Sequence, residues 1–322
     1  MEEEKKINVF ILTGFLGAGK TTVLNQLLRQ FEGERNVVIE NEFGKVNIDA
    51  QLIDSSYESV YEMTNGCICC SLDEELYGAL SEIAQKKEQT DNIFIETSGV
   101  ADAGNIATVF KVEHVAQLFD LKKLICLTDA ENFEDYINEA IEPQRQVVAA
   151  DLIVLNKASL VNGIYLQSLK KKIQSINPYA TIVETDTGAF DKQLLFEKNS
   201  EEKMALPQEI TGDNTHKINN VLHESDEVFE YLALYHVLNT TLFLYYNQIF
   251  RIKGFVRCIN SSDPNPEVKT YVVHSTGKTL TITLVEKKDF TQNQLVFIGK
   301  QLKTPTVERI LRGAVYKEKV NS

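Results

Sequence analysis

The sequence predicts an α/β fold in which a doubly wound, mostly parallel sheet is followed by a smaller α+β domain. In the first half of the chain, short β-branched apolar runs alternate with amphipathic stretches. Such alternation requires crossover connections, which produce parallel strands covered by helices. In the second half, strand candidates cluster after one long helix candidate, a pattern that favours a mostly antiparallel sheet.

The expected strands of the first domain are short apolar runs bounded by polar residues or glycine, as parallel strands buried on both faces should be. They lie at residues 7–12, 37–39, 93–95, 124–127, 152–155 and 181–183. The helix-like segments between them lie at residues 21–31, 74–86 and 163–176. We expect this domain to span residues 1–205, because the alternation ends near residue 190.

The second domain is expected at residues 214–322, after a polar connection. Residues 192–210 are rich in Lys, Glu and Gln and predict the tail of a helix followed by a linker. The elements expected beyond it are a strand at 217–223, a helix at 227–246, strands at 249–259, 269–274, 279–285 and 294–298, and a last helix from Thr306.

The charge balance excludes two classes of partner. The 322-residue chain carries 33 Lys and Arg against 46 Asp and Glu, a formal net charge of −13. It therefore lacks the cationic surplus with which proteins bind nucleic acids and anionic membranes nonspecifically. No apolar run approaches the roughly 18 residues of a membrane span, and residues 1–6 do not resemble a signal peptide. A soluble, cytoplasmic protein is expected.

A glycine-rich loop follows the first expected strand. It reads G-F-L-G-A-G-K-T-T and fits the pattern G-x-x-x-x-G-K-[ST] between a strand and a helix. Backbone N–H groups of such a loop surround phosphates, Lys20 is expected to reach the β- and γ-phosphates, and the Thr21 hydroxyl is expected to bind Mg²⁺. The candidate nucleotide-binding residues here are Gly14, Gly17, Ala18, Gly19, Lys20, Thr21 and Thr22. The alternative is a glycine-rich turn that merely precedes a lysine; the pattern favours a P-loop NTPase domain.

A candidate catalytic acid ends the expected strand at 93–95. Glu96 is followed three residues later by Gly99. The carboxylate would lie near the metal, and the Gly99 N–H would bind the γ-phosphate and move when that phosphate leaves. The alternative is a strand that ends in a solvated glutamate and a turn.

Asn156 and Lys157 follow a later expected strand and resemble the start of the guanine-reading N-K-x-D motif of GTPases. The Asp of that motif accepts hydrogen bonds from guanine N1–H and the exocyclic amine, groups that adenine lacks. Ser159 stands in the position of that Asp. A hydroxyl brings no charge, so GTP is favoured but discrimination against ATP is expected to weaken.

Three of the five cysteines lie together in the stretch N-G-C-I-C-C, as Cys67, Cys69 and Cys70. In a reducing compartment such thiolates most often bind a soft or borderline metal, commonly Zn²⁺, and a further ligand from elsewhere is expected. The alternative is a buried or redox-active cluster without metal. Cys126 and Cys258 are interpreted as small buried hydrophobic residues.

The chain closely resembles the CobW-like GTPases, which belong with the nickel-insertion GTPases of hydrogenase and urease maturation. The resemblance covers nearly the whole chain and rests on the phosphate loop, E-N-E-F-G at 40–44, N-G-C-I-C-C at 65–70 and E-T-S-G at 96–99; Gln146 also agrees with it. It implies a metallochaperone, a GTPase whose nucleotide state controls binding of zinc, or sometimes cobalt, and its transfer to a client protein. A homo-oligomer is compatible with this resemblance.

The resemblance also implies roles for particular residues. The transition-metal ligands would be Cys67, Cys69 and Cys70, with help from Glu40. Asp49 would join Thr21 at Mg²⁺, and Glu96 and Asp49 would organise the ion and the attacking water. With switches at 40–49 and 96–102, hydrolysis would change metal affinity by moving Glu40 relative to the thiolates.

The sequence departs from the family pattern at Lys45, where relatives often carry a metal-binding Glu, at Ala103, where Pro is common, and at Ser159. It also lacks the His-rich loop of many zinc-handling relatives. Arg145 is a weak candidate for an arginine finger. A nucleotide-binding metal buffer or sensor without useful turnover is one alternative, and a small-molecule kinase is another, although no arginine-bearing lid is evident.

Overall fold

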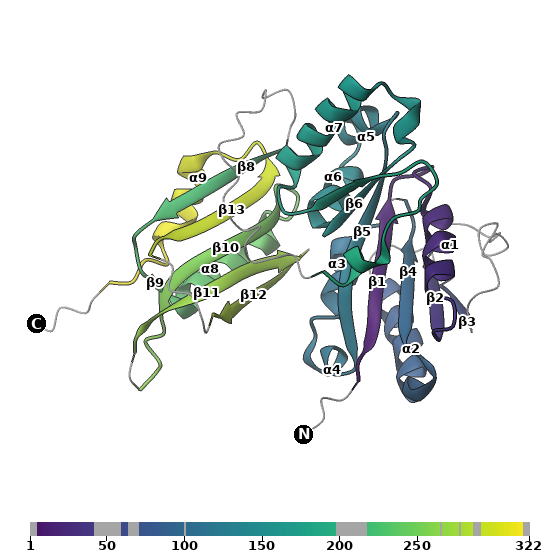
Figure 1. Cartoon of the computed structure of the whole chain (residues 1–322). Coiled ribbons are helices and arrows are strands. Elements are labelled where there is room, and N and C mark those ends of the chain that lie inside the picture. The colour runs from purple at the N-terminus through teal and green to yellow at the C-terminus, as the bar shows by residue number, and fades with distance from the viewer. Residues whose placement is uncertain are drawn as a thin grey trace, which may run out of the picture. The chain divides into compact units, whose positions relative to one another are not determined.

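A computed structural model describes residues 5–41, 59–63, 71–99, 101–197, 218–264, 266–276, 278–285 and 291–317 (Figure 1). The chain separates into two compact units, Met1–Pro207 and Gln208–Ser322. Across these described ranges, no helix combines the length and the apolar character needed to cross a membrane.

The first unit is built on a parallel sheet whose described strands number seven, in the order β3-β2-β4-β1-β5-β6-β7. They are β1 (Ile7–Gly14), β2 (Asn36–Asn41), β3 (Ser59–Met63), β4 (Asn92–Thr97), β5 (Phe119–Asp129), β6 (Leu152–Asn156) and β7 (Thr181–Glu184). The order of strands reverses direction at β1, which pairs with β4 on one side and with β5 on the other. Open α/β sheets bind ligands at the carboxyl ends of their strands at such a point.

The strands predicted for the first domain are all present, and each extends beyond its apolar run. The sequence pattern does not predict β3, because its residues S-V-Y-E-M form neither a continuous apolar run nor a long alternation. It also misses α3 (Ala103–Val109), α4 (Glu113–Ala116), α5 (Phe133–Glu139) and α6 (Glu142–Ala149), which are too short to show a helical period. The predicted helix tail at 192–210 is wrong at its start, where the structure has the 3₁₀ helix η4 (Lys192–Leu195); residues 198–210 lie outside the described ranges.

The longer helices of the first unit agree with the predicted segments. They are α1 (Lys20–Gln30), α2 (Ser71–Gln85) and α7 (Gly163–Ile176), and short 3₁₀ helices occur as η2 (Lys87–Gln89) and η3 (Ala158–Leu160). Helix α1 buries one apolar face, made of Val23, Leu24, Leu27 and Leu28. That face packs into a core with Phe10, Leu12, Val38 and Phe94, which therefore mark the α1 side of β1, β2 and β4.

The second unit is an α+β domain with a mostly antiparallel sheet, as predicted. Its described strands are β8 (Ile218–Ser225), β9 (Phe229–Glu230), β10 (Ile249–Ile259), β11 (Val268–Thr276), β12 (Thr279–Leu284) and β13 (Asn293–Lys300). The order is β12-β11-β10-β13-β8, and the short β9 pairs in parallel with β10. Helices α8 (Tyr231–Leu244) and α9 (Thr304–Arg312) bury apolar side chains in the same core as this sheet.

Helix α8 begins later than the predicted residue 227 because of its cap. The Glu230 carboxylate accepts a hydrogen bond from the Ala233 N–H at 2.7 Å and satisfies one of the free donors of the first helical turn. Residues before the cap form β9 instead of helix. The start of the helix is thus decided by one side chain.

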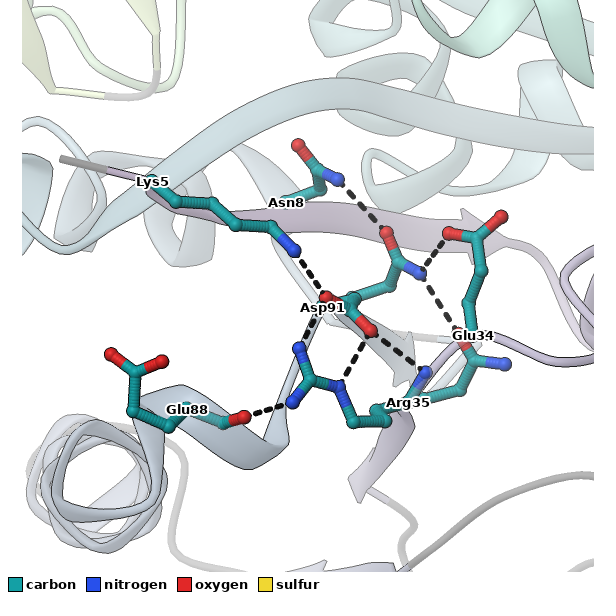
Figure 2. A network of polar contacts seen from close by, with 8 residues as sticks. Lys5, Asn8, Glu34, Arg35, Glu88 and Asp91 are labelled. Carbon is teal, nitrogen blue, oxygen red and sulfur yellow. Dashed lines mark hydrogen bonds and ion pairs between the residues drawn. The ribbon is translucent and has the colours of Figure 1, made fainter. Parts of the chain in front are cut away.

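A polar network joins the amino ends of β1, β2 and β4, opposite the carboxyl ends where ligands bind (Figure 2). Asp91 accepts hydrogen bonds from the Arg35 side chain at 2.8 Å and from Lys5 Nζ at 2.5 Å. Beside it, the buried Asn92 amide donates to Asn36 Oδ1 at 2.9 Å. The Arg35 hydrogen bond is the main reason that the pKa of Asp91 lies well below its usual 3.8; burial opposes this shift and Lys5 adds to it.

Replacing Asp91 with Asn is expected to lower the free energy of unfolding by about 2 kcal/mol at pH 7, since charge-assisted hydrogen bonds are lost. Because folding lowers the pKa of Asp91, its contribution is complete well above pH 3.8 and is lost as the pH falls through that value towards the folded-state pKa. The difference in stability between wild type and Asp91→Asn should therefore begin to narrow below about pH 5 and keep narrowing as the pH falls well below 3.8, in urea unfolding followed by circular dichroism. Asp120→Asn, a half-exposed control, should change little. A deficit that stays constant with pH would contradict the ion-pair origin of this effect.

Candidate functional site

The phosphate loop connects β1 to α1 at the carboxyl end of the central strand. Its backbone enters the left-handed region at Gly17, with φ of 76°, and at Gly19, with φ of 94°. A Cβ atom at Gly19 would lie 2.5 Å from Asn156 Nδ2, and one at Gly14 would lie 2.4 Å from the carbonyl oxygen of Leu127 in β5. The loop can therefore approach its neighbours only with glycine at these positions.

The start of α1 is suited to an anionic ligand. Gly19 supplies no side-chain cap, and Lys20, Thr21 and Thr22 form the first turn. The N–H groups of such a turn have no partner within the helix and carry the positive end of its dipole. The predicted phosphate-binding residues thus lie in one loop and one helical turn, as their spacing requires.

Glu96 is the penultimate residue of β4, beside the phosphate loop, and is 8% exposed. Its Oε1 accepts a hydrogen bond from Thr21 Oγ1 at 3.1 Å. One residue on, Thr97 Oγ1 donates to Thr13 Oγ1 in β1 at 3.0 Å. The structure therefore brings together two of the residues predicted at Mg²⁺, a hydroxyl and a carboxylate, which are oxygen donors that this hard cation prefers. The third, Asp49, lies outside the described residues.

Glu40 lies directly beside Glu96 in the sheet. β2 and β4 are parallel neighbours, and their register pairs Glu40 with Glu96. Because side chains alternate along a strand, Glu40 shares the α1 face with Val38, just as Glu96 shares it with Phe94. Glu40 is 4% exposed. The residue predicted to help bind the transition metal and the residue predicted to organise Mg²⁺ thus occupy adjacent strands on one face.

The predicted metal ligands Cys67, Cys69 and Cys70 lie outside the described residues, as does Lys45. Within the ranges that the structure describes, no three His, Cys, Asp or Glu side chains are grouped to hold a metal.

The two remaining cysteines are buried free thiols, as predicted. Burial raises the pKa of Cys126 to about 12, and it has the same effect on Cys258. A thiol with so high a pKa stays protonated at neutral pH. Among the described residues, neither thiol belongs to a group of three His, Cys, Asp or Glu side chains that could hold a metal.

The loop after β4 is held against the phosphate loop. A Cβ at Gly99 would lie 2.8 Å from the Leu16 backbone nitrogen, so the two backbones approach closely. From α6, the buried Gln146 amide donates to the carbonyl oxygens of Gly99 and Ala101, each at 3.1 Å. The resemblance to the family includes Gln146 but implies no role for it; the fold shows that it fixes this loop.

Arg145, adjacent to Gln146 on α6, faces Asp102. The guanidinium Nη1 lies 3.5 Å from Asp102 Oδ2, and Asp102 also caps α3 through the Asn105 N–H. The predicted weak arginine finger is therefore engaged with Asp102, the last residue of the predicted second switch. Ala103, the position where relatives often carry Pro, is the first residue of α3 and is buried.

Asn156 and Lys157 lie at the carboxyl end of β6, next to the phosphate loop. Asn156 Nδ2 donates to the Ala18 carbonyl oxygen at 3.0 Å. Lys157 has φ of 58°, in the left-handed region, and its Nζ lies 2.7 Å from Asp129 Oδ2 at the end of β5. The motif is thus anchored both to the phosphate loop and to the neighbouring strand.

The Asp129–Lys157 pair is charged at neutral pH. Burial raises the pKa of Asp129, but hydrogen bonds from Lys157 and Asn132 outweigh it and leave that pKa below its usual value. The hydrogen bond to Asp129 is the main cause of the raised pKa of Lys157. Sequence patterns alone do not single out Asp129. A carboxylate at the carboxyl end of a buried strand nevertheless indicates the edge of the sheet where α/β proteins bind ligands.

Two family models match the chain. The first is the CobW/HypB/UreG nucleotide-binding domain, at residues 8–184, and the second is the cobalamin synthesis protein CobW C-terminal domain, at residues 218–315. Both lie within the units seen in the structure.

Similar proteins support the same grouping. The zinc chaperone YjiA of Escherichia coli is 34% identical over 261 residues, which cover 78% of this chain and 81% of that protein. The zinc chaperone CobW of Pseudomonas aeruginosa is 30% identical over 248 residues, 67% of this chain and 65% of that protein. The crystal structure of the Zn(II)-bound YjiA GTPase from E. coli aligns with a TM-score of 0.71 and 25% identity, covering 97% of this chain and 99% of the other. The chain therefore belongs to the CobW/HypB/UreG family and carries the CobW C-terminal domain.

Proposed function

We propose that this protein is a GTP-hydrolysing metallochaperone that binds a transition metal, zinc in the first place, and delivers it to a client protein under control of nucleotide state. Its G domain at 1–205 would bind nucleotide and metal, and its CobW C-terminal-like domain spans 214–322. The single observation that supports this proposal best is the register that pairs Glu40 with Glu96, because it would couple a residue expected at the transition metal to a residue expected at the nucleotide. A reducing cytoplasm would keep the cysteine triplet available as thiolates.

For the nucleotide half, each residue has a defined role. The N–H groups of the loop from Gly14 to Thr22 would hold the phosphates, and Lys20 would stabilise charge on the transferring phosphoryl group. Thr21 and Asp49 would hold Mg²⁺, which when bound neutralises charge on the phosphate oxygens. Glu96 and Asp49 would orient the attacking water, and Asn156 and Lys157 would lie at the base.

For the metal half, Cys67, Cys69 and Cys70 would supply thiolates and Glu40 a carboxylate. Loss of the γ-phosphate would release the Gly99 N–H, and the loop held by Gln146 would shift against the phosphate loop. Glu96 lies near the end of the strand that precedes this loop, and Glu40 is its neighbour in the sheet. Metal affinity would therefore depend on whether GTP or GDP is bound.

A nucleotide-binding metal buffer without useful turnover is a second candidate. This second function is favoured by the contact of Arg145 with Asp102, because that contact engages the candidate arginine finger with the predicted second switch. Turnover of GTP, measured with and without Zn²⁺, separates the two functions: a buffer would bind GTP and show no metal-dependent hydrolysis.

The metal site is tested by titrating Zn²⁺ and Co²⁺ into reduced protein against a competing chelator. Wild type and Cys126→Ala, a control at a buried thiol with a pKa of about 12, are expected to show cobalt–thiolate charge-transfer bands. The triple variant Cys67→Ser, Cys69→Ser, Cys70→Ser is expected to show none. Bands that persist in that variant would place the metal on other thiolates. Bands that are absent from wild type would mean that no thiolate binds the metal. Either result would overturn the metallochaperone part of the proposed function.

The coupling between the sites is tested by measuring Zn²⁺ affinity with a non-hydrolysable GTP analogue and with GDP. The two affinities should differ by about 10-fold, within the range of coupling between linked sites. Glu40→Gln is expected to reduce this difference while leaving the thiolate bands in place. Equal affinities in wild type would contradict the coupling.

A further inference from the structure

Ser159 removes the carboxylate from the guanine-reading motif, but the fold places another carboxylate beside it. The Ser159 backbone N–H donates to Asp186 Oδ1 at 2.7 Å, and both residues are exposed. Within the part of the chain that the structure describes, Asp186 makes no other hydrogen bond or ion pair, so Oδ2 remains available to a ligand.

The position of Asp186 follows from how the loop after β7 is anchored. The Ala158 N–H donates to the Thr185 carbonyl oxygen at 3.2 Å, and the Thr185 N–H donates to the Leu155 carbonyl oxygen at 3.0 Å. Thr185 Oγ1 also accepts from the Thr187 N–H at 3.3 Å. Thr185, the residue before Asp186, is thus held to the segment that carries Asn156 and Lys157, and Thr187, the residue after it, is held to Thr185.

A second anchor joins this loop to the phosphate-binding helix. Gly188 has φ of 78°, and a Cβ at that position would lie 2.8 Å from Val23 Cγ2 in α1. Helix α1 begins at Lys20, the residue expected at the β- and γ-phosphates. The Asp186 loop therefore contacts both the base-reading segment and the helix that follows the phosphate loop.

We propose that Asp186 is the specificity-determining residue for the base, replacing from the next strand the carboxylate that Ser159 lacks. This inference rests on the proposed function, which places GTP at this site. A carboxylate only accepts hydrogen bonds, and guanine presents two adjacent donors, N1–H and the exocyclic amine at C2. Adenine has an acceptor at N1 and no amine at C2, so it would leave the Asp186 charge without a partner.

Ser159 and Asp186 would therefore share the role that a single Asp has in the usual motif. Ser159 contributes its backbone N–H, which orients Asp186, and Asp186 contributes the charge. Because charge-assisted hydrogen bonds are stronger than neutral ones, discrimination between GTP and ATP is retained. On this proposal the preference for GTP would be stronger than the presence of Ser159 alone predicts.

Competitive binding of GTP, ATP and XTP to the full chain, measured by displacement of a fluorescent nucleotide, tests the inference. Wild type is expected to prefer GTP to ATP by about 100-fold, and Asp186→Asn to lose most of that preference. Asp186→Asn should also gain affinity for XTP, because xanthine carries a carbonyl at C2 that an amide N–H can donate to. Glu184→Gln, an exposed control at the end of β7, should keep the wild-type preference.

A second variant tests whether Asp186→Asn lowers the preference for GTP by disordering the loop instead of by removing the charge. Adding Ser159→Asp to Asp186→Asn restores a carboxylate at the motif position and is expected to restore the preference for GTP. Equal losses of GTP and ATP affinity, or an unchanged preference in Asp186→Asn, would overturn the role of Asp186 while the proposed function stands. Failure of wild type to bind either GTP or ATP would overturn the proposed function itself.

Discussion

Replacing Lys20 with Ala is expected to lower GTP turnover by about 10³-fold, equivalent to about 4 kcal/mol of transition-state stabilisation. Lys20 is the first residue of α1, directly after the left-handed Gly19, so its ammonium group is delivered by the loop that surrounds the phosphates. The transferring phosphoryl group would lose the ammonium group that is expected to stabilise its charge. Single-turnover hydrolysis at saturating GTP and Mg²⁺ measures the effect on the chemical step.

Two variants make this test specific. Lys20→Arg keeps the positive charge but replaces a compact ammonium with a broad planar guanidinium, so it should not restore turnover. Lys171→Ala removes an exposed lysine from α7 and should leave turnover unchanged. Turnover of Lys20→Ala within about twofold of wild type would show that phosphoryl transfer does not use this loop.

Replacing Glu96 with Gln is expected to lower GTP turnover by about 10²-fold and to raise the Mg²⁺ concentration needed for half-maximal activity. The amide keeps the shape of the side chain and the oxygen that accepts from Thr21 Oγ1, so the local packing is preserved. It lacks the negative charge that attracts the ion and orients the water. GTP affinity measured without Mg²⁺ should change little.

Glu88→Gln is the matched control for this substitution, since Glu88 is exposed and lies in η2, next to the opposite end of β4. Its turnover and Mg²⁺ dependence are expected to equal those of wild type. If Glu96→Gln retained both properties as well, Glu96 would be a structural partner of Thr21 and the catalytic assignment would fail.

Much of the fold could be predicted from local patterns. The strands of the first domain were found because each buried parallel strand is a continuous apolar run between polar residues. The strand at Ile249–Ile259 was predicted with its observed bounds for a related reason, a long β-branched and aromatic segment. Edge strand β3 and the short helices were missed, because a few residues with mixed polarity carry no clear period.

The site was predicted only where its residues belong to short sequence motifs. The phosphate loop and the Asn156–Lys157 pair could be recognised from sequence, because each motif is a short run with its own chemistry. The contacts of Asp129, Gln146 and Asp186 were missed, since each acts on a partner that lies far along the chain or in another element. Asp129 stands at the end of a buried strand and Gln146 agrees with the family pattern, but neither feature identifies the partner, and nothing local distinguishes Asp186 from an ordinary polar position.

Local patterns along the chain establish the kind of protein: a parallel α/β domain with a phosphate loop, a cysteine triplet and a second, antiparallel domain. Which residues meet depends on the tertiary fold. Strand order places β4 between β1 and β2, and this order brings Glu40 beside Glu96 and Glu96 beside Thr21. The same sheet brings Asp186 to Ser159. Such pairings arise from the packing of apolar faces across the whole domain, and no local pattern encodes them.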